Sequence, residues 1–210
     1  MKADIIPSIL SLDEAEIQGN LNILEKYFKT VQIDVMDGKF VPQKRFSPDF
    51  VSKLKTTMQK EAHLMVDEPD KLVDEYIKAG AKTIIFHIEA VKNPFTLIKK
   101  LKNRKIKVGI AVNPETGLQK VKPYLDKIDQ LLIMTVNPGK GGQKLIQSML
   151  NKVKEARKLS KKLIIEVDGG INNSNIKEAI SAGANYVVVG SALVDGDLKK
   201  NIKEFKELIR

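Results

Sequence analysis

The sequence predicts a single-domain (β/α)8 TIM barrel, an α/β fold, over residues 1–210. Short β-branched apolar runs alternate with helix-period stretches along the chain, which is typical of a parallel sheet covered by helices. A helix–glycine–strand pattern recurs after about half of the chain. Aspartates stand at the ends of two of the apolar runs, where such a barrel places its active site. We find no linker, low-complexity tract or second domain.

Eight runs predict the strands of the barrel. Several are continuously apolar, as expected for parallel strands that are covered on both faces. They are residues 5–10, 31–35, 62–66, 83–87, 107–112, 131–136, 163–167 and 186–189.

The stretches between these runs have helical periodicity and predict the outer layer. They include residues 13–29, 69–78, 93–103, 117–125, 145–159 and 174–181.

An internal repeat favours a closed barrel over an open sheet. Residues 78–87 and 181–190 both read as the end of a helix, a glycine and a buried strand, with Gly80 and Gly183 in matching places. Four strand–helix units separate the two copies, so the chain divides into two equivalent halves. Chance similarity of an Ala-Gly-Ala turn is the alternative.

Composition narrows the class of function. The chain has 42% hydrophobic residues, no cysteine and a net charge of +10. It has no apolar run of about 18 residues and no signal-peptide pattern, so we expect a cytoplasmic protein without a membrane partner. The excess charge is mostly lysine on expected helix faces, and there is no tryptophan, which disfavours nucleic-acid binding. A positive field would attract an anionic substrate.

Acidic and histidine side chains at strand ends are the candidates for chemistry. Asp34 and Asp168 suggest a paired acid and base, although an aspartate before a turn more often caps a helix. Asp37, before Gly38, suits that turn role better. His63 is either a buried core histidine or a metal ligand beside the two aspartates. His87 and Glu89 are weaker candidates.

Three glycine loops on neighbouring strands predict a phosphate site. Backbone N–H groups can surround phosphate oxygens where no side chain intervenes, and the loops after the last strands of such barrels commonly do this. Methionines at three strand mouths are either core filler or the wall of a dry pocket. The loop residues are Gly139, Lys140, Gly141, Gly142, Gly169, Gly170, Gly190 and Ser191, and the methionines are Met36, Met65 and Met134.

Together these residues resemble the ribulose-phosphate 3-epimerase family over nearly the whole chain. The matching segments are residues 7–11, 33–38, 40–42, 63–66, 113–114, 134–139, 141–143, 167–171 and 189–192. The resemblance implies a ribulose-phosphate-binding type of barrel and a carbohydrate isomerase of the pentose phosphate pathway.

The resemblance also implies roles for individual residues. Asp34 and Asp168 would be the acid/base groups and, with His63, would hold a divalent metal such as Zn, Fe, Mn or Co. Ser8 would contact the substrate, a small ketose phosphate, and the glycine loops would hold its phosphate. We expect a homo-oligomer.

The chemistry of C3 inversion independently asks for such parts. The C3 proton is acidic because C2 is a carbonyl, and its removal leaves an enediolate whose charge must be stabilised. Because the proton leaves one face and returns to the other, two carboxylates are needed. The decarboxylase-like barrels pair Asp-x-Lys-x-x-Asp on a strand, and residues 34–37 lack the lysine.

Four positions depart from the family pattern, and Gln32 matters most. The family places a metal-ligating histidine there, and Lys39, Gln43 and Lys140 are the other departures. An amide oxygen can ligate a hard cation but is a poorer donor than imidazole to zinc or iron. Three alternatives stay open. The chain is an epimerase with a more weakly bound or harder metal ion such as Mn²⁺ or Mg²⁺, and Gln32 is then a further candidate ligand. Otherwise it is an epimerase for another ketose phosphate such as D-allulose 6-phosphate, or a catalytically impaired protein that binds a phosphosugar.

Overall fold

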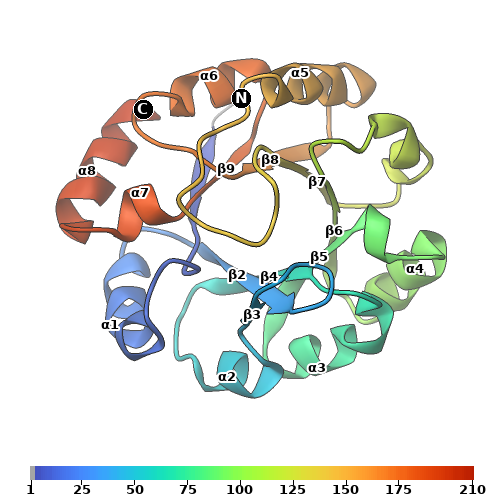
Figure 1. Ribbon diagram of the computed structural model, residues 1–210, viewed down its shortest axis with the longest axis horizontal. Helices are drawn as coiled ribbons and strands as arrows, with labels where there is room; N and C mark the ends of the chain where they lie inside the picture. The colour runs from blue at the N-terminus through green and yellow to red at the C-terminus, as the bar shows by residue number, and fades with distance from the viewer. Residues whose placement is uncertain (1–2) are drawn as a thin grey trace.

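The computed structural model describes residues 3–210 and confirms the predicted barrel. A nine-stranded sheet runs in the order β1-β9-β8-β7-β6-β5-β4-β2-β3, and every neighbouring pair except β2 and β3 is parallel. A parallel bridge between Ser8 and Gln32 joins the first strand to β2 and closes the ring. Figure 1 looks into this ring of strands, with the helices arranged outside it.

The eight parallel strands agree with the predicted runs to within a few residues. They are β1 (Asp4–Pro7), β2 (Thr30–Asp37), β4 (Gln59–Met65), β5 (Ala81–His87), β6 (Lys107–Val112), β7 (Gln130–Met134), β8 (Ile164–Asp168) and β9 (Tyr186–Val189).

One strand was not predicted from the sequence. The two-residue β3 (Lys44–Arg45) pairs antiparallel with the end of β2, after a turn that includes Gly38 at φ 79°. It is too short to show alternation, so only the folded turn reveals it.

The helices form the outer layer, and most coincide with the predicted stretches. They are α1 (Glu14–Leu24), α2 (Pro48–Lys53), α3 (Val73–Lys78), α4 (Pro94–Asn103), α5 (Met149–Leu159), α6 (Ile176–Ala182), α7 (Ser191–Val194) and α8 (Leu198–Leu208), with 3-10 turns η1 (Pro69–Lys71), η2 (Ile88–Ala90), η3 (Leu118–Lys120) and η4 (Lys122–Tyr124). Helices α2, α7 and α8 add to the predicted ranges.

Two helix predictions were too generous. Residues 117–125 form the two 3-10 turns η3 and η4 rather than a helix, and Pro123 lacks the N–H that a continuous helix would need there. Helix α1 ends at Leu24 rather than at the predicted residue 29. The backbone N–H groups of Tyr27 and Phe28 both donate to the carbonyl oxygen of Leu24. Neither change moves a strand end.

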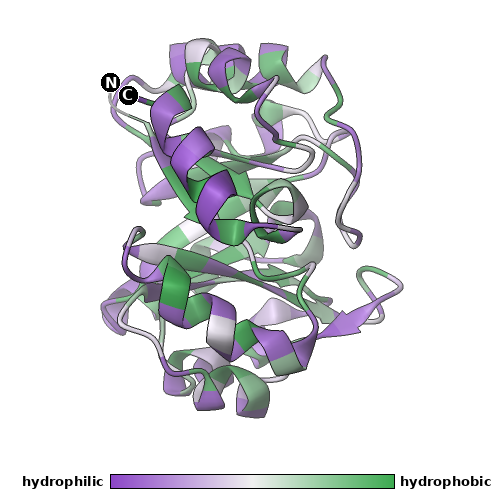
Figure 2. Cartoon of the chain, turned by 90° about the vertical axis from the view of Figure 1, so that its left-hand side faces the viewer, coloured by the Kyte–Doolittle hydropathy of each residue, from purple (hydrophilic) through white to green (hydrophobic). Residues whose placement is uncertain are grey.

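The main apolar core lies between the strands and the helices. Strand residues such as Ile33, Leu64 and Val167 pack there against helix residues such as Leu21 and Val153. Figure 2 shows hydrophobic colour concentrated on the strands, while the helices carry both colours. No helix within residues 3–210 is long and apolar enough to cross a membrane.

The repeated helix–glycine–strand pattern is present in both halves. Gly80 after α3 and Gly183 after α6 have φ angles of 98° and 119°, in the region that favours glycine. Each leads directly into a buried strand, β5 or β9. The repeat therefore marks equivalent places in the barrel.

Candidate active site

Asp34, His63 and Asp168 meet inside the carboxyl-terminal end of the barrel. Asp34 lies in β2 opposite His63 in β4, and Asp168 ends β8. His63 Nδ1 lies 2.9 Å from Asp34 Oδ1 and 3.4 Å from Asp168 Oδ2. One ligand atom from each residue lies within 4.8 Å of the others. The structure thus brings together the three residues that were expected to share a site, and Asp34 lies within strand β2 rather than before a helix.

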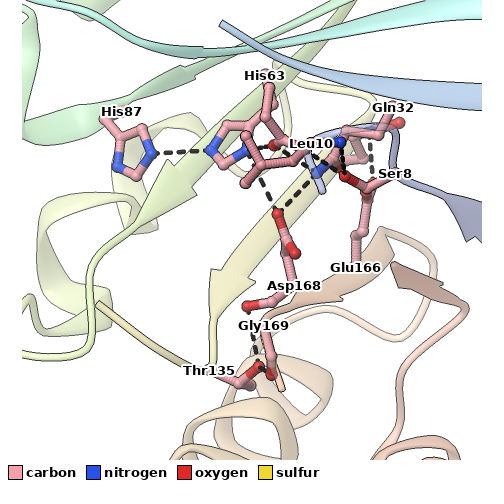
Figure 3. A network of polar contacts seen from close by, with 11 residues as sticks. Ser8, Leu10, Gln32, His63, His87, Thr135, Glu166, Asp168 and Gly169 are labelled. Atoms are coloured by element: carbon pink, nitrogen blue, oxygen red, sulfur yellow. Dashed lines mark hydrogen bonds and ion pairs between the residues drawn. The ribbon is translucent and has the colours of Figure 1, made fainter. Parts of the chain in front are cut away.

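Gln32 completes this cluster in an unexpected way. Its amide Nε2 donates to Asp34 Oδ1 at 2.8 Å and to Asp168 Oδ2 at 2.7 Å, so one NH2 group bridges both carboxylates (Figure 3). The side chain is fully buried, and its Oε1 has no hydrogen-bond partner. The amide therefore contacts the same two oxygens that His63 Nδ1 approaches.

A second polar layer lies immediately below. Glu61 and Glu166 each precede a cluster residue by two positions on the same strand, so their side chains point into the barrel as well. The amide Nε2 of Gln130 donates to both, at 2.8 Å and 2.7 Å. Burial raises the pKa of both carboxyls, and the neighbouring Glu61 raises that of Glu166 further. This layer was not predicted from the sequence, because its residues lie before the carboxyl-terminal ends of their strands, where no motif marks them.

A chain of ring and carboxylate contacts leads sideways from the cluster. His63 Nε2 lies 2.9 Å from Nε2 of His87, whose Nδ1 lies 3.4 Å from Glu89 Oε2. Burial lowers the pKa of His87 to about 4. Burial alone would also lower the pKa of His63, but hydrogen bonds and charge interactions with Asp168 and Asp34 raise it to about 9. In the metal-free protein at neutral pH, the protonated imidazole is therefore His63.

The environment separates the two aspartates. Asp34 is buried and accepts a 2.6 Å hydrogen bond from Ser8 Oγ on Oδ2, while its Oδ1 is taken by Gln32 and His63. The side chain of Asp168 is 16% exposed. Burial raises the pKa of Asp168, the hydrogen bond from His63 opposes this, and the charge of Asp34 adds to the rise.

The predicted glycine loops and both aspartates border one pocket, which encloses about 570 Å³ including its open mouth. The predicted residues that line it are Ser8, Asp34, Met65, Met134, Gly139, Lys140, Gly141, Gly142, Asp168, Gly169, Gly170, Gly190 and Ser191. His63 and Gln32 lie beneath it, fully buried.

Met36 has a different place from the other two methionines. It is buried in a small apolar cluster with Val41 and Met65, which Leu10 and Phe40 partly cover. Only Met65 and Met134 of the three border the pocket. Met36 supports that wall from behind.

Two of the loop glycines are required for steric reasons. Gly170 has φ 69°, and a Cβ there would collide with the backbone of Leu145. Gly139 has φ 105°, and a Cβ would lie 2.9 Å from that of Val41. At these two positions the loops present bare backbone to the pocket and cannot easily carry a side chain.

Three polar residues that we did not single out hold these loops or the strand ends beside them. Thr135 Oγ1 donates to the carbonyl oxygens of Asp168 and Gly169, which fixes the end of β8. Gln143 Nε2 donates to two carbonyls of its own loop. Lys152 Nζ donates to three carbonyls after β6, those of Asn113, Pro114 and Thr116. The bonds of Thr135 and Lys152 depend on tertiary contacts that no local pattern shows, whereas those of Gln143 lie within one loop.

Asp37 has the turn role expected for it. Its Oδ1 accepts the backbone N–H groups of Lys39 and Phe40, and its Oδ2 accepts that of Asp67. The carboxylate is thus occupied in joining two loops and is not part of the cluster.

The cluster residues fit a divalent metal ion. Two carboxylates and an imidazole are a common donor set for such ions, and the imidazole has its second nitrogen engaged by His87, as ligating histidines usually do. The unpartnered Oε1 of Gln32 is a further buried oxygen next to this set.

Comparisons with known proteins agree with this geometry. The model of the "Ribulose-phosphate 3 epimerase family" matches residues 4–194. A ribulose-phosphate 3-epimerase of Bacillus subtilis is 40% identical, with 96% of this chain and 97% of that protein covered. One of Eremothecium gossypii is 36% identical, with 100% and 94% covered.

Solved structures with low sequence identity show the same fold. A 3-hexulose-6-phosphate synthase from Salmonella typhimurium superimposes with a TM-score of 0.74 at 19% identity, covering 100% of this chain and 98% of that one. A phosphoribosyl anthranilate isomerase from Thermococcus kodakaraensis gives 0.71 at 15% identity, covering 100% and 99%. These likenesses concern the barrel alone.

Proposed function

Because the chain belongs to the ribulose-phosphate 3-epimerase family, we propose that it interconverts D-ribulose 5-phosphate and D-xylulose 5-phosphate. The observation that carries this is the placing of two carboxylates, Asp34 and Asp168, on one pocket together with three glycine loops. Inversion at C3 requires removal of a proton from one face and its return to the other. Two separate carboxylates on β2 and β8 suit that requirement.

The two aspartates divide the proton transfers. The carboxylate that is ionised takes the C3 proton, while the other supplies a proton to the opposite face of the enediolate. Burial raises the pKa of Asp168, so its carboxyl retains a proton at higher pH than an exposed aspartate does. Asp168 is therefore suited to donate the proton in one direction of the reaction. Ser8 donates to Asp34 Oδ2 and so holds that carboxylate in a fixed orientation.

The glycine loops orient the substrate by its phosphate. Residues 139–142, 169–170 and 190–191 border the same pocket as the aspartates, and their backbone N–H groups are the candidate phosphate donors. Binding a phosphate there fixes the sugar relative to the two carboxylates and limits escape of the enediolate. Met65 and Met134 provide an apolar wall, which keeps water from the reacting carbon.

A divalent metal ion would be held by Asp34, His63 and Asp168, with Gln32 as a further candidate ligand. When bound, such an ion supplies positive charge that stabilises the enediolate oxygens. His87 engages the second ring nitrogen of His63 and thereby orients the ligating one.

An exchange experiment tests the proposal directly. The protein is incubated with D-ribulose 5-phosphate in D₂O, with and without Mn²⁺, Zn²⁺ or Fe²⁺, and C3 deuterium and D-xylulose 5-phosphate are followed by NMR. We expect both to form. No exchange and no product under any metal would refute the epimerase proposal, and a rise in melting temperature alone would favour a phosphosugar-binding protein. Faster turnover of D-allulose 6-phosphate would favour the hexose substrate.

Two further expectations stay predictions. The cytoplasmic location and the homo-oligomeric state follow from the sequence analysis, and light scattering after size-exclusion chromatography measures the second.

A further inference from the structure

The amide of Gln32 has a definite orientation in the metal-free protein. Its Nε2 lies within hydrogen-bond distance of Asp34 Oδ1 and Asp168 Oδ2, so the N–H groups must face the carboxylates. Rotating the amide by half a turn exchanges Nε2 and Oε1. The oxygen would then face two carboxylate oxygens that have lost the N–H groups of Gln32, which is unfavourable unless a cation lies among the three.

The opposite end of the amide is unsatisfied. Oε1 of Gln32 is buried without a partner, and so are Oε1 of Glu61 and Oε1 of Glu166. Gln32 and Glu61 are register partners on β2 and β4, and Glu61 and Glu166 are joined through Gln130. Glu61 and Glu166 also contact each other, and the raised pKa of Glu166 lets the pair share a proton. The buried acceptor that still lacks a donor is therefore Oε1 of Gln32.

Half a turn of the amide would address both ends at once. It would turn the unpartnered Oε1 toward the cluster and move the N–H groups to the place that Oε1 now occupies. Gln130 does not supply a donor to Oε1, because its Nε2 already donates to Oε2 of both glutamates.

We propose that Gln32 is a rotating metal ligand: its amide N–H groups bridge Asp34 and Asp168 without metal, and its Oε1 turns inward to bind a divalent cation. The inference rests on the metal site of the proposed function. It adds that residue 32 selects the ion. An amide oxygen is a hard ligand, so the site prefers Mn²⁺ or Mg²⁺ relative to a site with imidazole at this place, which favours zinc and iron.

In an alternative interpretation, the Gln32 amide occupies the metal site and excludes the cation without ever ligating it. If Gln32 only blocks the cation, its removal should leave binding equal or tighter. If it ligates through Oε1, its removal should weaken binding. The Gln32→Leu variant separates the two, because leucine fills similar space but offers neither N–H nor oxygen.

Calorimetric titration of the purified, metal-stripped chain with Mn²⁺ and with Zn²⁺ measures this. We expect Gln32→Leu to bind Mn²⁺ at least about tenfold more weakly than the native chain. We expect Gln32→His to raise the ratio of Zn²⁺ to Mn²⁺ affinity by at least about tenfold. Gln59→Leu, at an exposed glutamine where β4 begins, is the matched control and should change neither value. Equal or tighter Mn²⁺ binding by Gln32→Leu overturns the proposal.

A second measurement uses the native protein, so it does not depend on whether a Gln32 variant folds. In the ¹⁵N-labelled native protein, the side-chain NH2 signals of Gln32 report the hydrogen bonds to the carboxylates. Saturation with diamagnetic Mg²⁺ should move both proton signals as the amide leaves Asp34 and Asp168. Cation binding in the calorimeter with these signals unmoved overturns the proposal, as does failure of Mn²⁺ and Mg²⁺ to bind at all.

These results are independent of the activity test. If the metal affinities and amide signals behave as expected but no C3 exchange occurs, the epimerase proposal is refuted and the proposal of a rotating ligand stands. If C3 exchange occurs but the amide signals of Gln32 do not move on cation binding, the proposal of a rotating ligand is refuted and the epimerase proposal stands.

Discussion

Metal binding should displace a proton from His63, and this makes the affinity depend steeply on pH. The pKa of His63 is raised to about 9, because its contacts with Asp168 and Asp34 outweigh the effect of burial. Its Nδ1 faces the carboxylates and can ligate an ion only without a proton. Raising the pH from 7 toward 9 is therefore expected to strengthen binding.

The magnitude follows from the size of the shift. Two pH units below its pKa, about 1% of the imidazole is neutral, so deprotonation costs roughly 3 kcal/mol of binding free energy at pH 7. The apparent affinity should rise nearly tenfold per pH unit between pH 7 and 8 and level off above pH 9. The pKa of His87 is lowered to about 4, so His87 is neutral throughout and does not contribute.

Titration calorimetry with Mn²⁺ in two buffers of different ionisation enthalpy measures the affinity and the number of protons released. We expect release of about one proton per ion at pH 7.5. The His63→Asn variant should bind more weakly and lose most of the pH dependence. An affinity that is constant from pH 7 to 9, without proton release, would show that His63 is not protonated in the metal-free site.

Three further predictions concern single substitutions. Asp34→Asn and Asp168→Asn should each lower the rate of C3 inversion by at least about a hundredfold, because an amide cannot transfer the proton, and retained turnover in either would refute the two-base assignment. Gly170→Ala should lower the free energy of unfolding by about 1–3 kcal/mol in denaturant titration, since φ is 69° and Leu145 leaves no space; an unchanged midpoint would contradict this. Lys152→Met should cost about 1–3 kcal/mol by the same assay because three carbonyls lose their donor, while KM changes little, and a large rise in KM would place Lys152 in substrate binding instead.

The strand ends could be predicted because the relevant signals are local. A mainly apolar run, interrupted only by Glu166 and followed by Asp168-Gly169-Gly170, specifies a buried strand and the loop after it without reference to the rest of the chain. The same holds for the positive φ angles of Gly80 and Gly183, which follow from helix ends. Residues at the carboxyl-terminal ends of the strands then lie close together, because all eight parallel strands end at the same side of the barrel.

The polar contacts inside the barrel could not be predicted in this way. Gln32 and Asp168 are 136 residues apart, and which end of the amide faces which carboxylate depends on all neighbours at once. Gln130 lies at the start of β7, outside any motif, yet joins two glutamates from different strands. Pattern reasoning finds the positions that point inward, and only the closed barrel shows which of them meet.

The charge balance of the interior explains why a glutamine can stand at position 32. Asp34 and Asp168 are compensated from below by two neutral N–H groups and from the side by protonated His63. A neutral donor stabilises the carboxylates without taking up a proton, so metal entry has to displace only one proton, that of His63. The same amide must break two hydrogen bonds before its oxygen can ligate. Breaking these two bonds therefore subtracts from the affinity that ligation through Oε1 supplies. Substitution of Gln32 by histidine should destabilise the metal-free site and strengthen zinc binding.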